Sequence, residues 1–228
     1  MERSSIVPLT ILLGGIIIAV SVYITTAQKK PISIHDENLS ALKSVGTNDH
    51  IFGSPTAPVI IIEYSDMECD YCATMQKTMQ KLMANYGPSG KVAWVFREFP
   101  LTELHQNSFK AAEAAECVAK TAGNEAFWKF TSLLFANQPV PPGKFGQYAS
   151  KAGADPSAVA TCIISGSVDA RISSDRKNAL DIGARGAPYA VILTSWASPV
   201  VINGVYPYSY LKQQIDAALA TVKSKEQK

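Results

Sequence analysis

The stretch APVIIIEYSDMECDYCATMQKTM, residues 57–79, contains the two features that decide the fold. Its first part, residues 57–65, is an apolar run with a proline near the start, which is typical of a strand buried on both faces of a sheet. From Cys69 onward, apolar residues recur at spacings of three and four, which predicts an amphipathic helix that ends at Gly87-Pro88. Two cysteines, Cys69 and Cys72, therefore lie where a buried strand passes into a helix.

The segments that follow this stretch predict an α/β fold. The segment KVAWVFREF (residues 91–99) is a second strand, so strand, helix and strand form a parallel βαβ unit with the cysteines at the carboxyl end of its first strand. Residues 104–185 show helical patterns only, with a helix stop at Gly123. A hairpin of two short strands and a closing amphipathic helix are expected at residues 189–194, 199–204 and 208–222. The expected order is βαβ, a helical insertion, and ββα.

The N-terminal part of the chain contains one long apolar run. Residues 6–24 carry no ionisable side chain, and this length is close to the roughly 20 residues that a helix needs to cross a bilayer. We expect an uncleaved membrane anchor, with a long signal peptide as the alternative. The expected division is an anchor or signal peptide at residues 1–28, a tether at 29–49, the first half of the α/β fold at 50–103, the helical insertion at 104–185, the second half at 186–222 and a tail at 223–228. Because the net charge is only +2 and the chain has no basic run with interleaved aromatic residues, we expect no nucleic-acid partner.

The chain has four cysteines, Cys69, Cys72, Cys117 and Cys162. Zinc ligands usually come as close pairs, and neither the last two cysteines nor the three histidines have that spacing, so we expect no metal. A redox role fits the CxxC pair better, because free N–H groups and the helix dipole stabilise a thiolate at a helix N-terminus. We expect Cys69 to be the exposed, reacting sulfur and Cys72 to be shielded and to resolve mixed disulfides.

Further candidate residues flank this pair. Glu63 ends the buried strand, where an acid with a pKa raised by burial can exchange a proton with the buried thiol; a glutamate in water is the alternative. A proline that opens a strand after a glycine makes Ala187-Pro188 a candidate cis bond, although these residues alone favour trans. Met67 and Tyr71 are candidates for an apolar rim that binds unfolded substrate chains, and packing within the loop explains them equally well.

Three acids, Asp66, Glu68 and Asp70, surround the first cysteine. Each is expected to raise the pKa of Cys69, against the helix terminus, which lowers it. His105 opens the helical insertion and is a candidate to approach the active site; a histidine at a helix start without a role is the alternative that we favour.

Several of these segments together resemble the DsbA-like thioredoxin-fold thiol–disulfide oxidoreductases. The resemblance covers roughly residues 51–219 and rests on IIEYSDMECDYC, FPLTELH, AAEAAECVAKTAGNEAFWKF, GARGAPYAVIL and INGVYPYSYLKQQID. It implies a thioredoxin fold with an all-helical insertion, in which Cys69 and Cys72 are the active-site pair, Glu63 is the buried acid, and Pro188 is cis with Ala187 before it.

The resemblance also implies a structural disulfide between Cys117 and Cys162, against the alternative of two unpaired cysteines. The chain departs from well-known members of the family in two places. The dipeptide between the active-site cysteines is Asp70-Tyr71, and Ala187 stands where threonine or valine is common.

The expected function is that of a thiol–disulfide oxidoreductase that donates the Cys69–Cys72 disulfide to reduced or unfolded exported proteins. We expect it to be anchored by residues 6–24 with its catalytic domain outside the cytoplasm, because structural disulfides persist there while the lysine and arginine count around the span is indecisive. The resemblance implies reoxidation by a membrane quinone-linked thiol oxidase, DsbB-like or vitamin K epoxide reductase-like, and no cofactor. A disulfide reductase or isomerase on the same fold, and a redox-inactive metallochaperone or binding module, are the alternatives.

Overall fold

The computed structural model describes residues 38–226, which belong to the unit Glu37–Lys228. The expected membrane span at residues 6–24 lies outside the described residues. Within them, none of the helices combines the length and the apolar character needed to cross a membrane.

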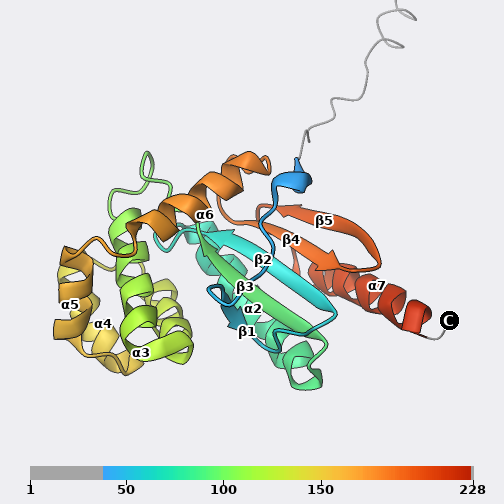
Figure 1. The fold of residues 1–228 in the computed structure, drawn as a ribbon, viewed down its shortest axis with the longest axis horizontal. Coiled ribbons are helices and arrows are strands. Elements are labelled where there is room, and N and C mark those ends of the chain that lie inside the picture. Colours follow the sequence, from blue (N-terminus) through green and yellow to red (C-terminus); the bar gives the residue numbers. More distant parts are fainter. Residues whose placement is uncertain (1–37, 227–228) are drawn as a thin grey trace, which may run out of the picture. The chain divides into compact units, whose positions relative to one another are not determined.

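Five strands form one mixed sheet at the centre of the described chain (Figure 1). They are β1 (His50–Phe52), β2 (Val59–Ser65), β3 (Val92–Glu98), β4 (Tyr189–Thr194) and β5 (Ala197–Asn203). Their order across the sheet is β1-β3-β2-β4-β5, with β2 parallel to β3 and the other neighbours antiparallel. The apolar strand β2 is the central strand. The two cysteines follow its carboxyl end, so they lie near the middle of that end of the sheet.

Helices cover both faces of this sheet and extend beside it. They are α2 (Asp70–Tyr86), α3 (Ser108–Ala136), α4 (Phe145–Ala152), α5 (Pro156–Ile164), α6 (Asp169–Asp181) and α7 (Tyr208–Glu226), together with 3-10 helices at Leu39–Ala41, Gly87–Ser89 and Pro142–Lys144. Helices α2 and α7 pack into the core on one face, and α6 packs into a second core on the other. Helices α3, α4 and α5 lie together beside the sheet (Figure 1).

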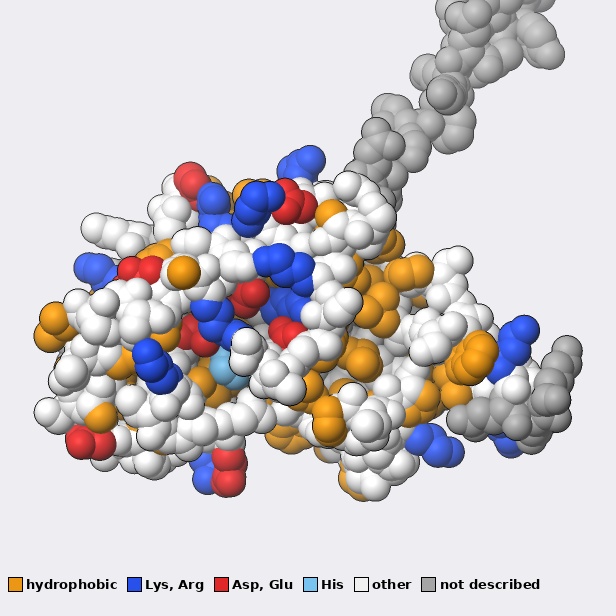
Figure 2. Space-filling model, in the orientation of Figure 1, with side chains coloured by type: hydrophobic (Ala, Val, Ile, Leu, Met, Phe, Trp, Pro, Cys, Tyr) orange, Lys and Arg blue, Asp and Glu red, His pale blue; other side chains and the backbone are white. Residues whose placement is uncertain are grey.

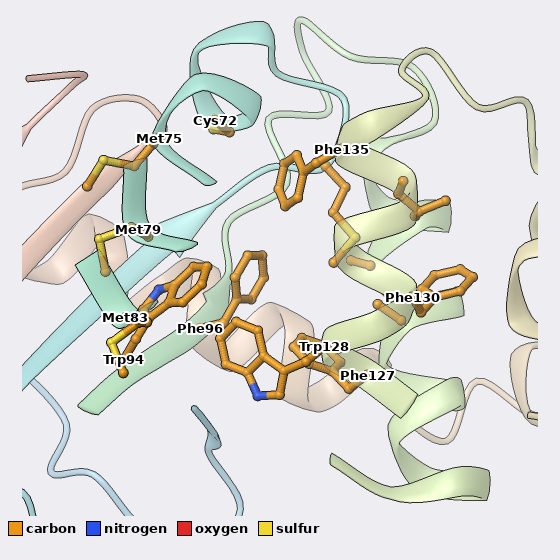
Figure 3. Packing of buried hydrophobic residues seen from close by; sticks show 14 of the residues in the cluster. Cys72, Met75, Met79, Met83, Trp94, Phe96, Phe127, Trp128, Phe130 and Phe135 are labelled. Atoms are coloured by element: carbon orange, nitrogen blue, oxygen red, sulfur yellow. The ribbon is translucent and has the colours of Figure 1, made fainter. Parts of the chain in front are cut away.

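The larger core lies between α2, the sheet and α3. Cys72, Met75 and Met79 of α2 belong to the same buried cluster as the strand residues Trp94 and Phe96 (Figure 3). Aromatic rings of α3 complete it: the Trp94 and Trp128 centroids are 4.5 Å apart, and those of Phe96 and Phe127 are 5.6 Å apart. This apolar packing fixes the orientation of α2 on the sheet, and therefore the orientation of the cysteines at its start.

Most of the predicted elements are confirmed. The βαβ unit, the helical segment that follows it, the β4–β5 hairpin and the closing helix all occur, with ends within a few residues of those expected. Gly123 interrupts α3 with φ 86° and ψ 178°, which agrees with the predicted helix stop, because that backbone conformation favours glycine. Strand β1 was not predicted, since a three-residue edge strand leaves almost no periodic signal.

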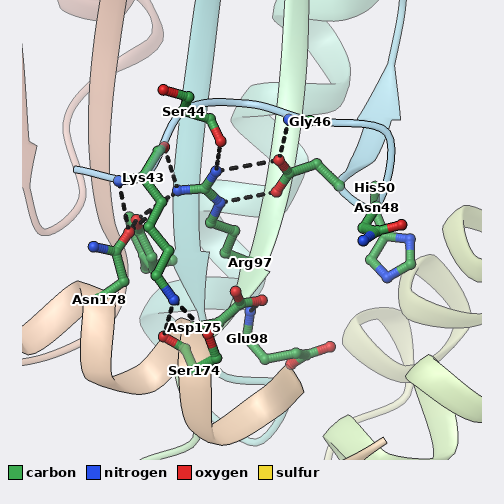
Figure 4. A network of polar contacts seen from close by, with 12 residues as sticks. Lys43, Ser44, Gly46, Asn48, His50, Arg97, Glu98, Ser174, Asp175 and Asn178 are labelled. Atoms are coloured by element: carbon green, nitrogen blue, oxygen red, sulfur yellow. Dashed lines mark hydrogen bonds and ion pairs between the residues drawn. The ribbon is translucent and has the colours of Figure 1, made fainter. Parts of the chain in front are cut away.

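Arg97 of β3 is the centre of a polar network on the sheet face opposite α2 (Figure 4). Its side chain is 3 % exposed, and it donates hydrogen bonds to Asp49 (2.9 Å), to the Tyr64 hydroxyl (2.9 Å) and to the carbonyls of Lys43 and Ser44. Basic and acidic side chains also lie close together near the middle of the face drawn in Figure 2. The network therefore holds part of the segment before β1, which we expected to be a tether, against the sheet.

Candidate active site

The two cysteines of the CxxC pair occupy different positions on α2. Cys69 immediately precedes the helix with an extended backbone (φ −84°, ψ 122°), whereas Cys72 lies in the first turn on the face that packs into the core. Both are free, Cys72 is fully buried, and 5 % of the surface of Cys69 is exposed. The structure thus places both at the start of α2 as the helical spacing predicts, but Cys69 is buried and not exposed as expected, although it is more accessible than Cys72.

This placement gives the two thiols opposite acidities. The pKa of Cys69 is lowered to about 6, first by a hydrogen bond from Cys72 and then by the backbone N–H groups of Cys72 and Tyr71; burial and the charge of Asp66 oppose the shift. Burial, together with its role as donor to Cys69, raises the pKa of Cys72 well above its usual value. At neutral pH the pair therefore consists of a thiolate at Cys69 and a protonated thiol at Cys72.

The segment before β4 lies against the reacting sulfur. The Ala187-Pro188 peptide bond is cis, and the Sγ of Cys69 lies 3.6 Å from the carbonyl oxygen of Ala187. The carbonyl of Pro188 accepts a hydrogen bond from the N–H of Gly204 at 2.9 Å, which fastens the segment to the end of β5. The backbone of Ala187 thus lies beside the sulfur, where the sequence placed it.

Glu63 lies under the same helix. It alternates with Val59 and Ile61 along β2, and those two residues belong to the core that contains Cys72, so its side chain faces α2. It is fully buried, and neither carboxyl oxygen has a hydrogen-bond partner among the described residues. Burial raises the pKa of Glu63 to about 7, so it can gain or lose a proton near neutral pH.

The two rim candidates lie in different environments. Tyr71 is 71 % exposed, so its ring is available to a partner. Met67 is only 3 % exposed and packs into the core, so it offers no exposed apolar surface. Cys117 of α3 and Cys162 of α5 are joined by a disulfide, with Cα atoms 5.7 Å apart, which ties two helices of the insertion together.

The three acids around Cys69 lie in different environments. The buried carboxylate of Asp66 accepts hydrogen bonds from the N–H groups of Leu101 (2.7 Å) and Glu68 (2.8 Å) and pairs with His105 at 2.9 Å. Glu68 accepts a hydrogen bond from the N–H of Asn107 at 2.7 Å. Asp70 is exposed in the first turn of α2. The acid whose charge acts on the pKa of Cys69 is thus the buried Asp66.

Two further residues contact this loop. His105, for which no role was the favoured prediction, pairs through its ring with Asp66, and Gln138 was not recognised in the sequence. Gln138, just after α3, donates from Nε2 to the carbonyls of Met67 (2.5 Å) and Cys69 (3.4 Å). Both lie in irregular segments far along the chain from the cysteines, so no periodic pattern marks them. Among residues 38–226, no group of three or more His, Cys, Asp or Glu side chains is arranged to hold a metal.

A CxxC pair at the start of a helix, after a central parallel strand and beside a cis-proline, defines a DsbA-like thioredoxin-fold protein. The chain belongs to the thioredoxin family, whose model matches residues 46–192.

Three solved structures share the fold. Alpha-DsbA1 of Wolbachia pipientis is 22% identical, covers 83% of this chain and 98% of its own, and gives a TM-score of 0.71. Oxidised BdbD of Bacillus subtilis is 22% identical, covering 76% and 94%, with a TM-score of 0.68. DsbA2 of Pseudomonas aeruginosa is 23% identical, covering 76% and 96%, with a TM-score of 0.65.

Curated relatives share a shorter region. The protein named Na(+)/H(+) antiporter NhaA 3 of Salinispora tropica is 37% identical over 108 residues, which is 47% of this chain but 16% of that protein. A second, named NhaA 1 of Mycolicibacterium gilvum, is 34% identical over a region of the same length and covers 17% of that protein. The chain therefore spans only a small part of the curated relatives that it matches.

Proposed function

We propose that this protein is a thiol–disulfide oxidoreductase that donates the Cys69–Cys72 disulfide to cysteines of exported proteins. The observation that carries the proposal is the unequal placement of the two sulfurs, with Cys69 at the start of α2 and Cys72 fully buried in its first turn. Cys69 is stabilised as a thiolate by a hydrogen bond from Cys72 and by the helix terminus. A thiolate that is stable in the reduced protein makes Cys69 a good leaving group, and so favours passing the disulfide on.

The transfer proceeds in two displacements. A substrate thiolate attacks the Sγ of Cys69, the Cys69–Cys72 bond breaks, and Cys72 takes up a proton, for which Glu63 is the buried acid at hand. A second substrate thiolate then attacks the substrate sulfur of the mixed disulfide, and Cys69 leaves as the thiolate. The substrate loses two electrons and gains a disulfide, and the enzyme is reduced to the dithiol.

The substrate in this proposal is an extended, reduced or unfolded chain. It lies along the backbone at Ala187-Pro188, within reach of Cys69, with the exposed ring of Tyr71 at the edge of the site. Because Met67 is buried, it takes part through its packing under the loop.

The proposed location is outside the cytoplasm, with residues 6–24 as the membrane anchor. The Cys117–Cys162 disulfide supports it, because structural disulfides persist in oxidising compartments. A membrane quinone-linked thiol oxidase, DsbB-like or vitamin K epoxide reductase-like, would return the dithiol to the disulfide. Ion transport, the activity in the names of the curated relatives, is not part of the proposal, because the shared region is a small part of those proteins.

The test is oxidative refolding of a reduced, unfolded disulfide protein with stoichiometric oxidised enzyme. Wild type should speed recovery of the native protein, and Cys69→Ser should abolish the effect, because the attacked sulfur is gone. The matched variant Cys72→Ser retains Cys69 but cannot form the disulfide that is donated, so it too should fail to speed refolding of the reduced substrate. If Cys69→Ser refolds the substrate as fast as wild type, the proposal fails.

The equilibrium with glutathione separates a donor from a reductase. A donor should have a reduction potential well above thioredoxin's value of about −270 mV, and a value near it would favour the reductase or isomerase. Stoichiometric bound metal without any refolding activity would instead favour a binding module.

A further inference from the structure

A pair of titratable side chains connects solvent to the loop that carries the cysteines. Asp66 directly follows β2, and its side chain is fully buried. His105, from the segment between β3 and α3, has 25 % of its side chain exposed and places Nδ1 2.9 Å from Oδ2 of Asp66. A proton on His105 can therefore exchange with water, while the carboxylate that it contacts is closed off from water.

Asp66 also contacts both cysteines through its backbone. Its N–H donates to the Sγ of Cys72 at 3.5 Å, and its carbonyl accepts from the N–H of Cys69 at 3.2 Å. The side chain and the backbone of this one residue thus place the His105 pair directly beside the redox pair.

The charges of this group act on one another. Burial lowers the pKa of His105, but the hydrogen bond and charge of Asp66, followed by the charges of Cys69 and Glu68, outweigh it and raise the pKa. Asp66 in turn raises the pKa of Cys69. When His105 is protonated, its positive charge offsets the negative charge of Asp66 near the Cys69 thiolate. When His105 is neutral, the charge of Asp66 acts on the thiolate without that offset.

We propose that His105 is a positioning residue for the redox pair, whose proton offsets the charge of Asp66 beside Cys69 and makes the disulfide more oxidising where His105 is protonated. The inference rests on the proposed function, because it concerns the same disulfide. Reduction takes two electrons and one proton: Cys72 binds the proton, and Cys69 becomes a thiolate. This new negative charge binds the His105 proton more tightly, so by linkage a protonated His105 favours the reduced form.

The other charged groups around the pair leave this link in place. Glu68 accepts a hydrogen bond from the N–H of Asn107 at 2.7 Å, and its charge adds to that of Asp66 in raising the pKa of His105. Burial, followed by the charges of Glu116 and Asp175, raises the pKa of Glu98 on the neighbouring strand well above its usual value.

Two more charges come from the His105 segment and from α6. Glu103, which is exposed, is paired with the half-buried Arg176 of α6 at 2.9 Å, so the two charges partly neutralise each other. Asp70, at the start of α2, is exposed, where solvent screens its charge.

The experiment is the glutathione equilibrium of the Cys69–Cys72 pair at pH 6 and pH 8, for wild type and His105→Asn. Asparagine can keep the hydrogen bond to Asp66 but cannot carry the proton. We expect the equilibrium constant for reduction of the variant to fall about fivefold at pH 6 relative to wild type, and to differ little at pH 8. A thiolate-absorbance titration should show a raised pKa for Cys69 in the variant. Glu103→Gln, which removes an exposed charge from the same segment, is the matched control and should behave as wild type.

A purely structural role for His105 would change the equilibrium equally at both pH values, and that result would overturn the inference. Thermal unfolding of each variant checks that the fold is kept, and His105→Gln replaces the asparagine variant if that one is unfolded. If wild type itself exchanges no disulfide with glutathione, the proposed function fails. If wild type exchanges and the variant runs parallel to it, only the role of His105 fails.

Discussion

At the scale of single residues, the pKa values of the site residues depend on the different surroundings of side chains that lie close together. Cys69 and Cys72 are one helical turn apart, yet helix-end N–H groups meet the first and apolar side chains enclose the second. Glu63 is enclosed in the same way, without a hydrogen-bond partner among the described residues. The low pKa of Cys69 and the high pKa values of the other two groups follow from these surroundings.

Replacing Glu63 by glutamine should stabilise the protein as the pH rises. The pKa of Glu63 is raised by burial to about 7 in the folded state from an unfolded value of 4.5. Its contribution to stability is therefore fully present below pH 4.5 and is lost as the pH rises through 7, by about 3 kcal/mol in total.

Urea unfolding of wild type and Glu63→Gln between pH 5 and pH 8 measures this difference. The free energy of unfolding of Glu63→Gln, relative to that of wild type, should increase from pH 5 to pH 8. The Cys69–Cys72 pair is kept in the same redox state in both proteins. An equal difference at every pH would mean that Glu63 does not carry the expected proton.

The sequence predicts the site residues that lie within one strand-to-helix stretch, but not the contacts made by residues from distant segments of the chain. Cys69, Cys72 and Glu63 lie on one strand-to-helix stretch, so periodicity alone placed them on their faces of β2 and α2. His105 and Gln138 reach the same loop from 39 and 71 positions away, and single hydrogen bonds from irregular segments leave no periodic trace. The acids were counted correctly but treated as equals, since burial distinguishes Asp66 from the other two and burial in a loop cannot be read from spacing.

At the scale of helices and strands, apolar packing positions the helix that carries the cysteines, and a disulfide joins two helices of the insertion. The apolar face of α2 packs against β3, which fixes where the helix begins and hence where Cys69 lies. In the insertion, the Cys117–Cys162 disulfide joins α3 to α5 across a separation of 45 residues. The helix packing was predictable from spacing, whereas this pairing followed from family resemblance, because four cysteines allow three pairings.

Replacing both Cys117 and Cys162 by alanine should reduce stability without changing the redox pair. Loss of a cross-link over a loop of this length is expected to cost about 3–4 kcal/mol in the chain-entropy model. Urea unfolding of the oxidised proteins measures the loss, and the glutathione equilibrium of Cys69–Cys72 should stay within twofold of wild type.

A double variant as stable as the wild type would show that the bridge contributes little to folding. A changed glutathione equilibrium would show that the insertion acts on the redox pair.

At the scale of the whole described chain, buried charges join segments that the apolar cores leave apart. Arg97 links β3 to the segment before β1 and, through the Asn178 side chain at 3.3 Å, to α6 (Figure 4). On the side of the insertion, Glu116 of α3 pairs with His50 of β1 at 3.0 Å and with Arg171 of α6 at 2.7 Å. No pattern in the sequence predicts these networks, because each partner comes from a different segment.

Replacing Arg97 by methionine should destabilise the fold at neutral pH. Burial alone would raise the pKa of Asp49, but the hydrogen bonds and charge of Arg97 and the Gly46 N–H outweigh it and hold the pKa below 3.8. Breaking such a buried pair typically costs about 3–5 kcal/mol, because the remaining charge loses its partner.

The sign of the pH dependence follows from the lowered pKa of Asp49. The stabilisation by the pair is present above the unfolded value of 3.8 and is lost as the pH falls through the folded value. Urea unfolding at pH 7 and pH 3 should therefore show a large deficit for Arg97→Met at pH 7 and a smaller one at pH 3. A deficit that is constant with pH would assign the effect to packing, and Lys177→Met, which removes an exposed cation of α6, is the control.

The burial of Cys72 also determines how the protein withstands chemical oxidants. Peroxide reaches Cys69, which has 5 % of its surface exposed, before it reaches the fully buried Cys72, so the first product is a sulfenic acid on Cys69. The thiol of Cys72 condenses with that acid, releases water and closes the same disulfide that serves the proposed reaction. The irreversible sulfinic and sulfonic acids form only if a second oxidant molecule arrives before this ring closure, so the buried Cys72 protects Cys69 against irreversible oxidation.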